Sequence, residues 1–279
     1  MKNIIRQQAK IVTHYQKAAV VPHLIGGRLF EKLELIKLAP TRVLDLGTGT
    51  GQFLKPLKTR FPQATVYGVD IALPMLVFNK KHQQWRHKFS LAAANSAHLP
   101  FLDNTFEFIF MNMVLPFGCD LVTTFKEISR VLKPDGLFLF SSCGSDTLKE
   151  LKTAWQQVDT DEHINQFPDM HDVADMLLHE GFADPVVDME VLTVNYQSVR
   201  QLIHELKNIG SVKLSSTMFK GLYTKDLIRK ISENYTTADG YYPVSVEVIY
   251  GHAWGKQLGT SIKNMDGSVS IPISRIKKQ

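Results

Sequence analysis

The sequence contains few cysteines and no motif that is typical of a metal site. Its 279 residues include only two cysteines, Cys119 and Cys143. They are too far apart in the chain for a metal-binding pair and too few for a disulfide framework. The ten histidines form no HExxH or comparable pairing. We therefore expect no metal site, reduced thiols and a cytoplasmic location.

Long apolar runs are also missing. No stretch of about 18 consecutive apolar residues occurs, so we expect no membrane-spanning helix. The first ten residues, MKNIIRQQAK, lack the apolar core of a signal peptide. Hydrophobic residues nevertheless make up 44% of the chain, which is enough apolar surface for the core of one large domain.

The basic charge does not point to nucleic acid. The net charge is +5, but the basic residues are dispersed, and the densest run is Asn79 to Lys88. A solvated helix end is the simpler interpretation of that run. The sequence contains no separate RNA-binding module and no platform of alternating aromatic and basic residues, so no nucleic-acid partner is expected. We expect the polar, basic tail of residues 255–279 to be flexible.

The most informative segment is VLDLGTGTG, residues 43–51, where an apolar run breaks into three alternating glycines. Glycine permits a tight turn and lets the backbone approach a ligand closely. The next apolar run, VYGVD, ends at Asp70, whose carboxylate offers two acceptors for a ribose diol. The pattern predicts a nucleoside-binding site. It differs from the dinucleotide fingerprint GxGxxG, because the third glycine comes one residue early.

With Asp45 two residues before the first glycine, the segment resembles motif I of the class I S-adenosylmethionine-dependent methyltransferases. The resemblance implies S-adenosylmethionine as the cofactor. This cofactor has no pyrophosphate, so it needs a bent loop around its amino-acid end. The candidate cofactor-binding residues are Asp45, Gly47, Thr48, Gly49, Gly51, Asp70, Ile71, Met75, Asn95, Ser96 and Asn112.

Strands and helices alternate along the chain, which predicts a parallel sheet with helices on both faces. We expect an α/β fold, Rossmann-like, with a mostly parallel seven-stranded sheet, N-terminal helices and a helical insertion before the last strand. The expected later strands are 90–93, 106–113, 137–141, 186–194 and 246–254, and the expected helices are 74–82, 121–132, 147–158, 173–179, 198–208 and 224–234.

We expect one domain, residues 1–254, in three parts. Residues 1–40 form a helical lid, residues 41–143 a cofactor-binding core, and residues 144–254 a substrate-side half with the insertion at about 198–234. In such a fold, ligands bind beyond the carboxyl ends of the strands. The lid and the insertion should therefore lie over the mouth of the site.

Several segments resemble the malonyl-[acyl-carrier-protein] O-methyltransferase family of biotin synthesis. The segments are HYQKAA, LPFLDNTFEFIF, RVLKPDG, GSDTLKELKTAWQQVD, HINQF, GFADPVVDMEVLTVNY and YGHAW. The resemblance runs from about His14 to Trp254. It implies that the substrate is the free carboxylate of a malonyl thioester on acyl-carrier protein. That carboxylate is ionised at neutral pH and needs no general base, in agreement with the absence of an acid–base constellation.

The resemblance also implies roles for particular side chains. Tyr15 matches the family's N-terminal tyrosine and is expected to position the methyl donor. His163, Asn165, Arg200 and Lys207 are candidates for holding the substrate carboxylate or the carrier arm. An acidic acyl-carrier protein is expected to dock on basic residues in or beside the inserted helices, namely Lys207, Lys213, Lys220, Lys225, Arg229 and Lys230.

The chain departs from the family pattern at three places. Asn95 replaces an acid, Pro116 and Phe117 replace a segment ending in Gln-Trp, and Ser211 to Lys213 replace Ala-x-Asn. Three alternatives therefore stay open. One is a relative of the protein-arginine hydroxylase that assists assembly of respiratory complex I, and a second is a non-catalytic cofactor-binding paralogue. The third, a nucleic-acid methyltransferase, is supported only by the basic charge.

Overall fold

The computed structural model describes residues 12, 15, 18–82, 89–114, 120–159, 163–209, 225–256, 262–263 and 269–270. Most of the basic tail lies outside these residues. So do two of the departures from the family pattern, Pro116–Phe117 and Ser211–Lys213, as well as Lys220 and residues 83–88 of the basic run.

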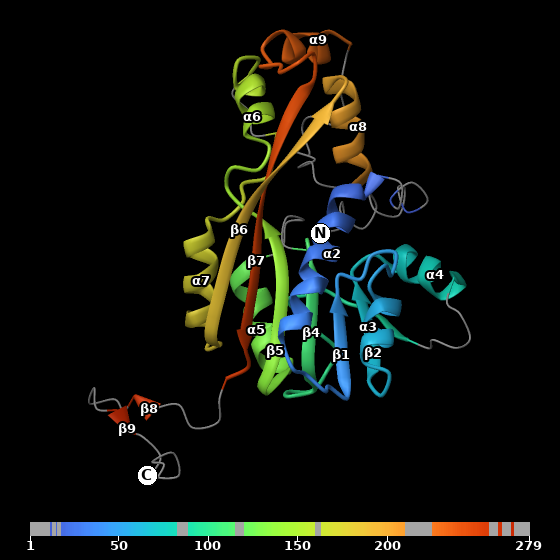
Figure 1. Cartoon of the computed structure of the whole chain (residues 1–279), viewed down its shortest axis with the longest axis vertical. Coiled ribbons are helices and arrows are strands. Elements are labelled where there is room, and N and C mark those ends of the chain that lie inside the picture. The colour runs from blue at the N-terminus through green and yellow to red at the C-terminus, as the bar shows by residue number, and fades with distance from the viewer. Residues whose placement is uncertain are drawn as a thin grey trace.

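A mixed seven-stranded sheet forms the centre of the structure (Figure 1). Its strands are β1 (Arg42–Leu46), β2 (Thr65–Asp70), β3 (Ser90–Ala93), β4 (Phe106–Asn112), β5 (Leu132–Cys143), β6 (Ala183–Tyr196) and β7 (Tyr242–Trp254). They lie in the order β3-β2-β1-β4-β5-β7-β6. Strands β1 to β5 pair in parallel, whereas β7 runs antiparallel to both β5 and β6. The mostly parallel sheet expected from the sequence is confirmed.

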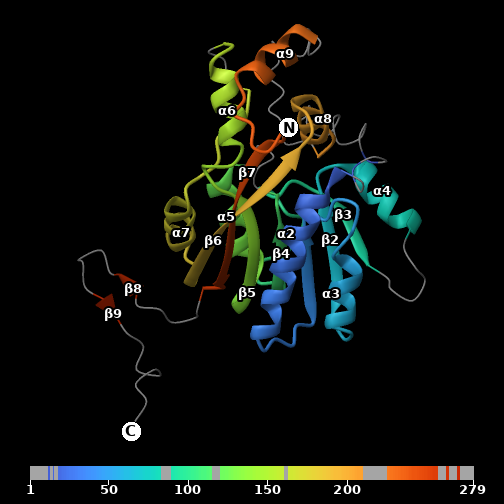
Figure 2. The same ribbon diagram turned by 45° about the horizontal axis from the view of Figure 1, so that its top comes forward.

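Helices cover both faces of this sheet (Figures 1 and 2). They are α2 (Val20–Glu31), α3 (Leu54–Arg60), α4 (Leu73–His82), α5 (Leu121–Val131), α6 (Lys149–Gln156), α7 (Met170–His179), α8 (Val199–Ile209) and α9 (Lys225–Glu233). A short 3-10 helix, η1 (Lys32–Leu35), follows α2, and β8 (Ile262–Lys263) pairs with β9 (Val269–Ser270) outside the main sheet. None of the helices in the described part of the chain is long and apolar enough to span a membrane.

The alternation of side chains along the central strands explains the two layers of core. On β4, Phe108 and Phe110 pack with α2 and α3 residues, while Ile109 and Met111 pack on the opposite face with α5 and α7 residues. All four side chains are fully buried. Such uninterrupted apolar strands are typical of a parallel sheet that is covered on both sides.

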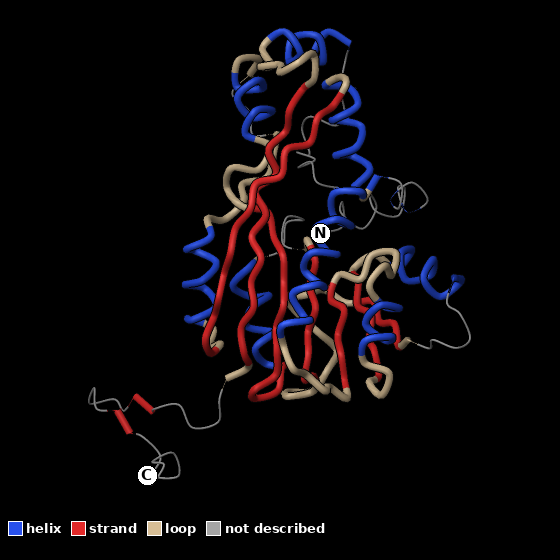
Figure 3. The backbone as a smooth tube through the Cα atoms, viewed as in Figure 1, coloured by secondary structure: helices blue, strands red, loops and turns tan. Residues whose placement is uncertain are grey.

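Strands β6 and β7 are longer than the sequence indicated. They stay paired from Ala183↔Trp254 to Tyr196↔Tyr242, whereas β5 pairs with β7 only as far as Cys143↔Val248. The two strands therefore continue beyond the sheet as a ribbon, and α6, α8 and α9 pack around it (Figure 3). The inserted helices α8 and α9 lie between β6 and β7 in sequence, as expected.

The sequence also indicated a later start for β5. We expected the preceding helix to span residues 121–132 and the strand to begin at Leu137. Helix α5 does end at Val131, but β5 begins at Leu132, which pairs with Phe106 across a register shift. The Gly136 carbonyl accepts a 2.7 Å hydrogen bond from the Gly255 amide, so the segment around Pro134 is held by a neighbouring chain segment.

Candidate functional site

Three glycines give the loop after β1 its conformation. Gly47, Gly49 and Gly51 have φ angles of 74°, 52° and 79°, a region that other residues disfavour. A Cβ atom on Gly47 would lie 2.1 Å from Val114 Cγ2, and one on Gly51 would lie 2.4 Å from Asn79 Oδ1. Glycine is therefore required at both ends of the loop, for the close packing there as well as for the conformation of the turn.

Asp70, at the end of β2, faces this loop with a carboxylate that backbone amides orient. Its Oδ2 atom accepts a hydrogen bond from the Gly49 amide, and its Oδ1 atom accepts one from the Ala72 amide, both at 2.8 Å. The side chain is buried, and burial raises the pKa of Asp70 while these amide hydrogen bonds oppose the increase. Each oxygen keeps a lone pair, so two neighbouring hydroxyl groups of a ligand can donate to it.

Asp45 places a second buried carboxylate near the first. The Thr48 hydroxyl donates a 2.6 Å hydrogen bond to Asp45 Oδ2. Burial raises the pKa of Asp45 to about 7, the Thr48 hydrogen bond opposes this increase, and the charge of Asp70 adds to it. The hydrogen-bond partners of both carboxylates in the described part of the chain are neutral. A nucleoside that carries a diol and a positive charge fits this donor and acceptor set.

Tyr15 covers the centre of the glycine loop. Its Cε1 and Oη atoms lie 3.7 Å and 3.9 Å from the position of a Cβ on Gly49. Burial, and then the charge of Asp70, raise the pKa of Tyr15 to about 12. The hydroxyl group is therefore protonated at neutral pH, which suits packing and hydrogen bonding rather than proton abstraction.

The sequence analysis missed Asn79, which braces the loop from α4. Asn79 Nδ2 donates a 2.8 Å hydrogen bond to the Gly49 carbonyl, and the side chain is buried. The available signal was weak, because Asn79 follows the buried residues Met75 and Leu76 on the same helical face. A polar residue on an apolar face often has a satisfied structural role, and here that role is to hold the loop.

Four of the predicted cofactor residues lie just beyond this centre. Ile71 follows Asp70 directly, and Met75 is buried in α4. Asn95 follows β3, where Oδ1 of its side chain accepts a hydrogen bond from the Ala97 amide at 3.2 Å. Ser96 is buried, with its hydroxyl oxygen 3.2 Å from that of Thr124. The Ala94 amide donates a hydrogen bond to the Asp70 carbonyl, so the segment after β3 that contains Asn95 and Ser96 lies next to Asp70.

Asn112 binds the N-terminal helix in this structure. Its Nδ2 atom donates to the Pro22 carbonyl at 3.0 Å, and its Oδ1 atom accepts from the Ser141 hydroxyl at 2.8 Å. Both polar atoms of the side chain thus connect α2 to the carboxyl ends of β4 and β5. Its place in the cofactor site stays a prediction, and its visible function is to position α2.

The four predicted substrate residues do not form one group. His163 is buried and stacks on Trp155 with ring centroids 4.4 Å apart, and its Nε2 atom lies 2.5 Å from Asp159 Oδ1. It is therefore part of the packing beside α6. Asn165 follows in the same segment and is partly buried.

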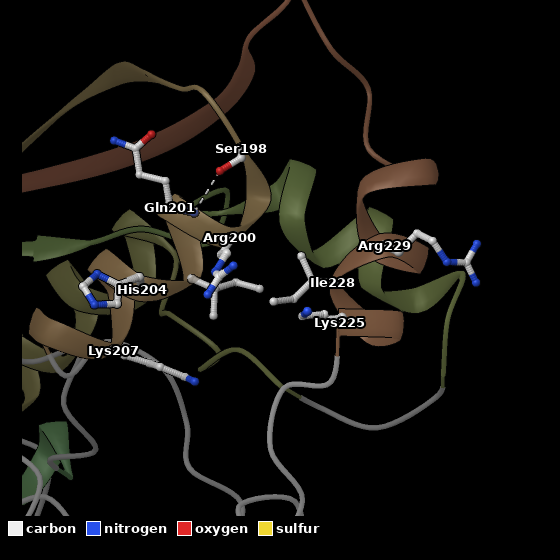
Figure 4. Close-up of a pocket in the computed structure, with 9 residues that line it drawn as sticks. Ser198, Arg200, Gln201, His204, Lys207, Lys225, Ile228 and Arg229 are labelled. Carbon is white, nitrogen blue, oxygen red and sulfur yellow. Dashed lines mark hydrogen bonds between the residues drawn. The ribbon is translucent and has the colours of Figure 1, made fainter.

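Arg200 and Lys207, by contrast, line one groove between α8 and α9 (Figure 4). The groove has a volume of about 730 Å³. Its described lining residues are Ser198, Arg200, Gln201, Ile203, His204, Lys207, Lys225, Ile228 and Arg229. Figures 1 and 2 place α8 beyond the carboxyl ends of the parallel strands, on the side of the glycine loop.

Comparison with known proteins agrees with this geometry. Residues 44–140 match the family model described as "Methyltransferase domain". The malonyl-[acyl-carrier protein] O-methyltransferase of Legionella pneumophila is 38% identical over 97% of this chain and 96% of its own. The enzyme of the same name from Gallionella capsiferriformans is 40% identical over 91% of this chain and 90% of its own. This chain belongs to the malonyl-[acyl-carrier protein] O-methyltransferase family. Its cofactor is accordingly S-adenosylmethionine, and the family resemblance seen in the sequence is confirmed.

Solved structures show the same fold in more distant proteins. The YcgJ protein of Bacillus subtilis has a TM-score of 0.61 and 16% identity, covering 85% of this chain and all of its own. Phosphoethanolamine N-methyltransferase 2 of Haemonchus contortus, solved with S-adenosyl-L-methionine, has a TM-score of 0.51 and 18% identity over 83% of this chain and 52% of its own. The Rossmann-like methyltransferase fold of the family is thereby confirmed.

Proposed function

We propose that this chain transfers the methyl group of S-adenosylmethionine to the free carboxylate of a malonyl thioester on acyl-carrier protein, for biotin synthesis in the cytoplasm. The supporting observation is a glycine loop held between the buried carboxylates of Asp45 and Asp70, in a chain of this family. The relatives named above are malonyl-[acyl-carrier protein] O-methyltransferases. None of these named relatives is an arginine hydroxylase.

In this proposal each part of the loop has a separate role. Asp70 accepts hydrogen bonds from both ribose hydroxyls, because backbone amides already fix its carboxylate. Asp45 stabilises the positive charge at the amino-acid end of the cofactor. Gly49, which has the most free space of the three loop glycines, lies against the ligand, and Tyr15 covers it.

The reaction needs alignment more than acid–base chemistry. When bound, S-adenosylmethionine supplies a methyl group on a positively charged sulfur. The malonyl carboxylate is already ionised, and Tyr15, with a pKa of about 12, does not act as a base near pH 7. Strong stabilisation of the carboxylate before reaction would slow the transfer. The protein therefore contributes orientation, which can be worth about 7–11 kcal/mol, and exclusion of water.

The proposal includes the lid that was expected from the sequence. The N-terminal segment of residues 1–40 includes Tyr15 and α2, and the insertion of residues 198–234 includes α8 and α9. Arg28 of α2 is 2.6 Å from Glu190, and Lys32 is 3.1 Å from Asp188. These contacts link the N-terminal segment to β6, the strand that leads into the insertion. The two segments would together exclude water from the mouth of the site.

The proposed partner is an acidic carrier protein that docks on α8 and α9. Two of the expected docking residues are already neutralised, because Arg229 lies 2.7 Å from both Asp226 and Glu233, and Lys230 lies 3.3 Å from Asp226. The other described members of the set are Lys225 and Lys207. Exposed charge contacts are weak and are screened by salt. Raising the ionic strength should thus lower kcat/KM for malonyl-acyl-carrier protein several-fold more than for malonyl-pantetheine.

The direct test of the function is a methyl-transfer assay with S-adenosylmethionine and malonyl-acyl-carrier protein, with malonyl-coenzyme A as the comparison. The proposal predicts ester formation on the malonyl group, with a higher kcat/KM for the carrier-bound substrate. Cofactor binding without transfer to either acceptor would instead support a non-catalytic paralogue. Transfer to RNA or DNA but not to malonyl thioesters would support a nucleic-acid methyltransferase.

A further inference from the structure

The groove between α8 and α9 is lined by several basic side chains. Arg200, His204 and Lys207 come from α8, while Lys225 and Arg229 come from α9. Among the described residues that line the groove, none is an aspartate or a glutamate. The two acidic residues of α9, Asp226 and Glu233, form ion pairs with Arg229. The guanidinium group of Arg229 points away from Arg200 and Lys225 in Figure 4.

Two other basic side chains of the groove approach it from opposite sides. Arg200 on α8 and Lys225 on α9 lie on opposite walls, with Ile228 between them in Figure 4. Lys207 lines the same groove nearer the far end of α8, and burial lowers its pKa. The guanidinium and ammonium groups suit the oxygens of a phosphate ester.

The apolar part of the lining limits the kind of anion. Ile203 and Ile228 contribute apolar surface beside the cations. A bare inorganic ion would leave this surface without a partner, whereas an ester on a flexible aliphatic arm would cover it. Helices α8 and α9, which line the groove, lie beyond the carboxyl ends of the parallel strands, and the glycine loop follows the carboxyl end of β1 (Figures 1 and 2).

We propose that the α8–α9 groove is a phosphate-ester site, in which Arg200 and Lys225 hold the phosphate of the pantetheine arm that carries the malonyl thioester. This inference rests on the proposed function and adds a ligand subsite to it. The same chemistry occurs in the phosphodiester of a carrier protein and in the phosphates of free coenzyme A. A phosphate held here would fix one end of the arm while its thioester end reaches the methyl donor.

The test compares two substrates that differ only in the phosphate, malonyl-pantetheine and malonyl-4′-phosphopantetheine. The unmodified protein should prefer the phosphorylated substrate about tenfold in kcat/KM, because charge-assisted hydrogen bonds to phosphate are strong. In the double variant Arg200→Gln, Lys225→Gln, the kcat/KM values for the two substrates should be about equal. The matched control is Lys126→Gln, which changes an exposed lysine of α5 that does not line the groove. It should keep the tenfold preference.

Three results would overturn the inference. One is a lack of preference in the unmodified protein, and another is a preference that survives in the double variant. The third is a double variant whose kcat/KM falls for malonyl-acyl-carrier protein but not for malonyl-coenzyme A. That result would assign Arg200 and Lys225 to contacts with the carrier protein itself. An equal fall in the kcat/KM of the double variant for malonyl-acyl-carrier protein and malonyl-coenzyme A would support the phosphate site.

A binding measurement separates this inference from the proposed function. Calorimetry with 4′-phosphopantetheine and with pantetheine needs no methyl transfer. If no malonyl thioester is methylated but the phosphorylated arm alone binds, and the double variant abolishes that binding, the groove assignment stands and the proposed function fails. If neither compound binds and transfer still occurs, the proposed function stands and the groove assignment fails.

Discussion

Asn79 Nδ2 donates a 2.8 Å hydrogen bond to the carbonyl oxygen of Gly49, and so connects α4 to the centre of the glycine loop. The neighbouring Gly51 has no Cβ, which leaves the space that the Asn79 side chain occupies. On its other side, Gly49 donates its amide to Asp70. The peptide units that flank Gly49 are thus fixed from two elements before any ligand binds, which is the preorganisation that binding requires.

Replacement of Asn79 should therefore weaken cofactor binding without direct contact with the cofactor. A buried hydrogen bond to the backbone is worth about 1 kcal/mol or more, so Asn79→Ala should raise the Kd for S-adenosylhomocysteine about tenfold. Isothermal titration calorimetry measures this change. Lys80→Ala, at the next and exposed position of α4, is the matched control and should leave the Kd unchanged. An unaltered Kd in Asn79→Ala would show that the loop does not depend on this brace.

Two adjacent glycines of α2 should respond in opposite directions to the same substitution. A Cβ on Gly26 would lie 2.3 Å from Phe53 Cζ and 2.7 Å from Asn112 Nδ2, whereas one on Gly27 would meet no atom within 4 Å. Gly26→Ala should lower the free energy of unfolding by about 1–3 kcal/mol, because it separates α2 from the sheet. Gly27→Ala should raise it by up to about 1 kcal/mol through helix propensity.

Urea denaturation of both variants measures these two changes in the free energy of unfolding. The helix propensity gained is the same at both positions, so the difference between the variants reports the packing of α2 alone. Equal free energies of unfolding would contradict the close contact of α2 with Phe53 and Asn112.

The buried carboxylate of Asp45 predicts a pH dependence. Burial raises its pKa from 3.8 to about 7, so the folded, cofactor-free protein binds more protons than the unfolded chain between these values. The Asp45 contribution to stability therefore falls as pH rises from about 4 to about 7. Asp45→Asn removes this contribution, and its Tm relative to the unmodified protein should increase over that range. A Tm difference that is independent of pH would contradict the assignment.

The same group should link cofactor affinity to pH. A cationic ligand favours the ionised form of Asp45, so binding should release a proton and weaken as pH falls below about 7. Calorimetry in two buffers of different ionisation enthalpy measures the proton release. Asp45→Asn should bind the cofactor more weakly at neutral pH and release no proton from this group.

Tyr15 should act through its ring rather than through proton transfer. The hydroxyl group has a pKa of about 12, so Tyr15→Phe should keep kcat within about threefold of the unmodified protein. Tyr15→Ala should lower kcat by about tenfold or more, because it removes the cover over Gly49 and admits water. Steady-state kinetics from pH 7 to 10 would check both variants. A kcat for Tyr15→Phe as low as that of Tyr15→Ala would assign a chemical role to the hydroxyl group.

The spacing of the glycines along the chain made the glycine loop predictable. Contacts between elements that are distant in sequence could not be predicted. The tight turn at the three glycines and the place of Asp70 beside it could be predicted from the sequence, because each lies at the end of a buried strand. The role of Asn79 depends on how α4 packs against the loop, which its own sequence does not specify. Asn112 was predicted correctly at a strand end, but an amide can bind a ligand or a helix, and only the position of Pro22 shows which groups it contacts here.

The residues on the substrate side were harder to predict, because their roles also depend on contacts between elements that are distant in sequence. His163 belongs to a motif that indicated a site residue, yet Trp155 and Asp159 enclose it. Arg200 and Lys225 are far apart in sequence, and they share a groove only because the β6–β7 ribbon carries both inserted helices. The start of β7 was missed because Pro243, which cannot donate a backbone hydrogen bond to a sheet, precedes the apolar VEVIY segment.

The central claim is that Asp70 and the glycine loop support methyl transfer to a carboxylate. The most direct measurement is transfer of labelled methyl from S-adenosylmethionine to malonyl-acyl-carrier protein, with butyryl-acyl-carrier protein as an acceptor that lacks the carboxylate. We predict a base-labile methyl ester on the malonyl substrate only, and a loss of about tenfold or more in kcat/KM in Asp70→Ala. Equal labelling of both acceptors, or undiminished transfer by Asp70→Ala, would contradict it.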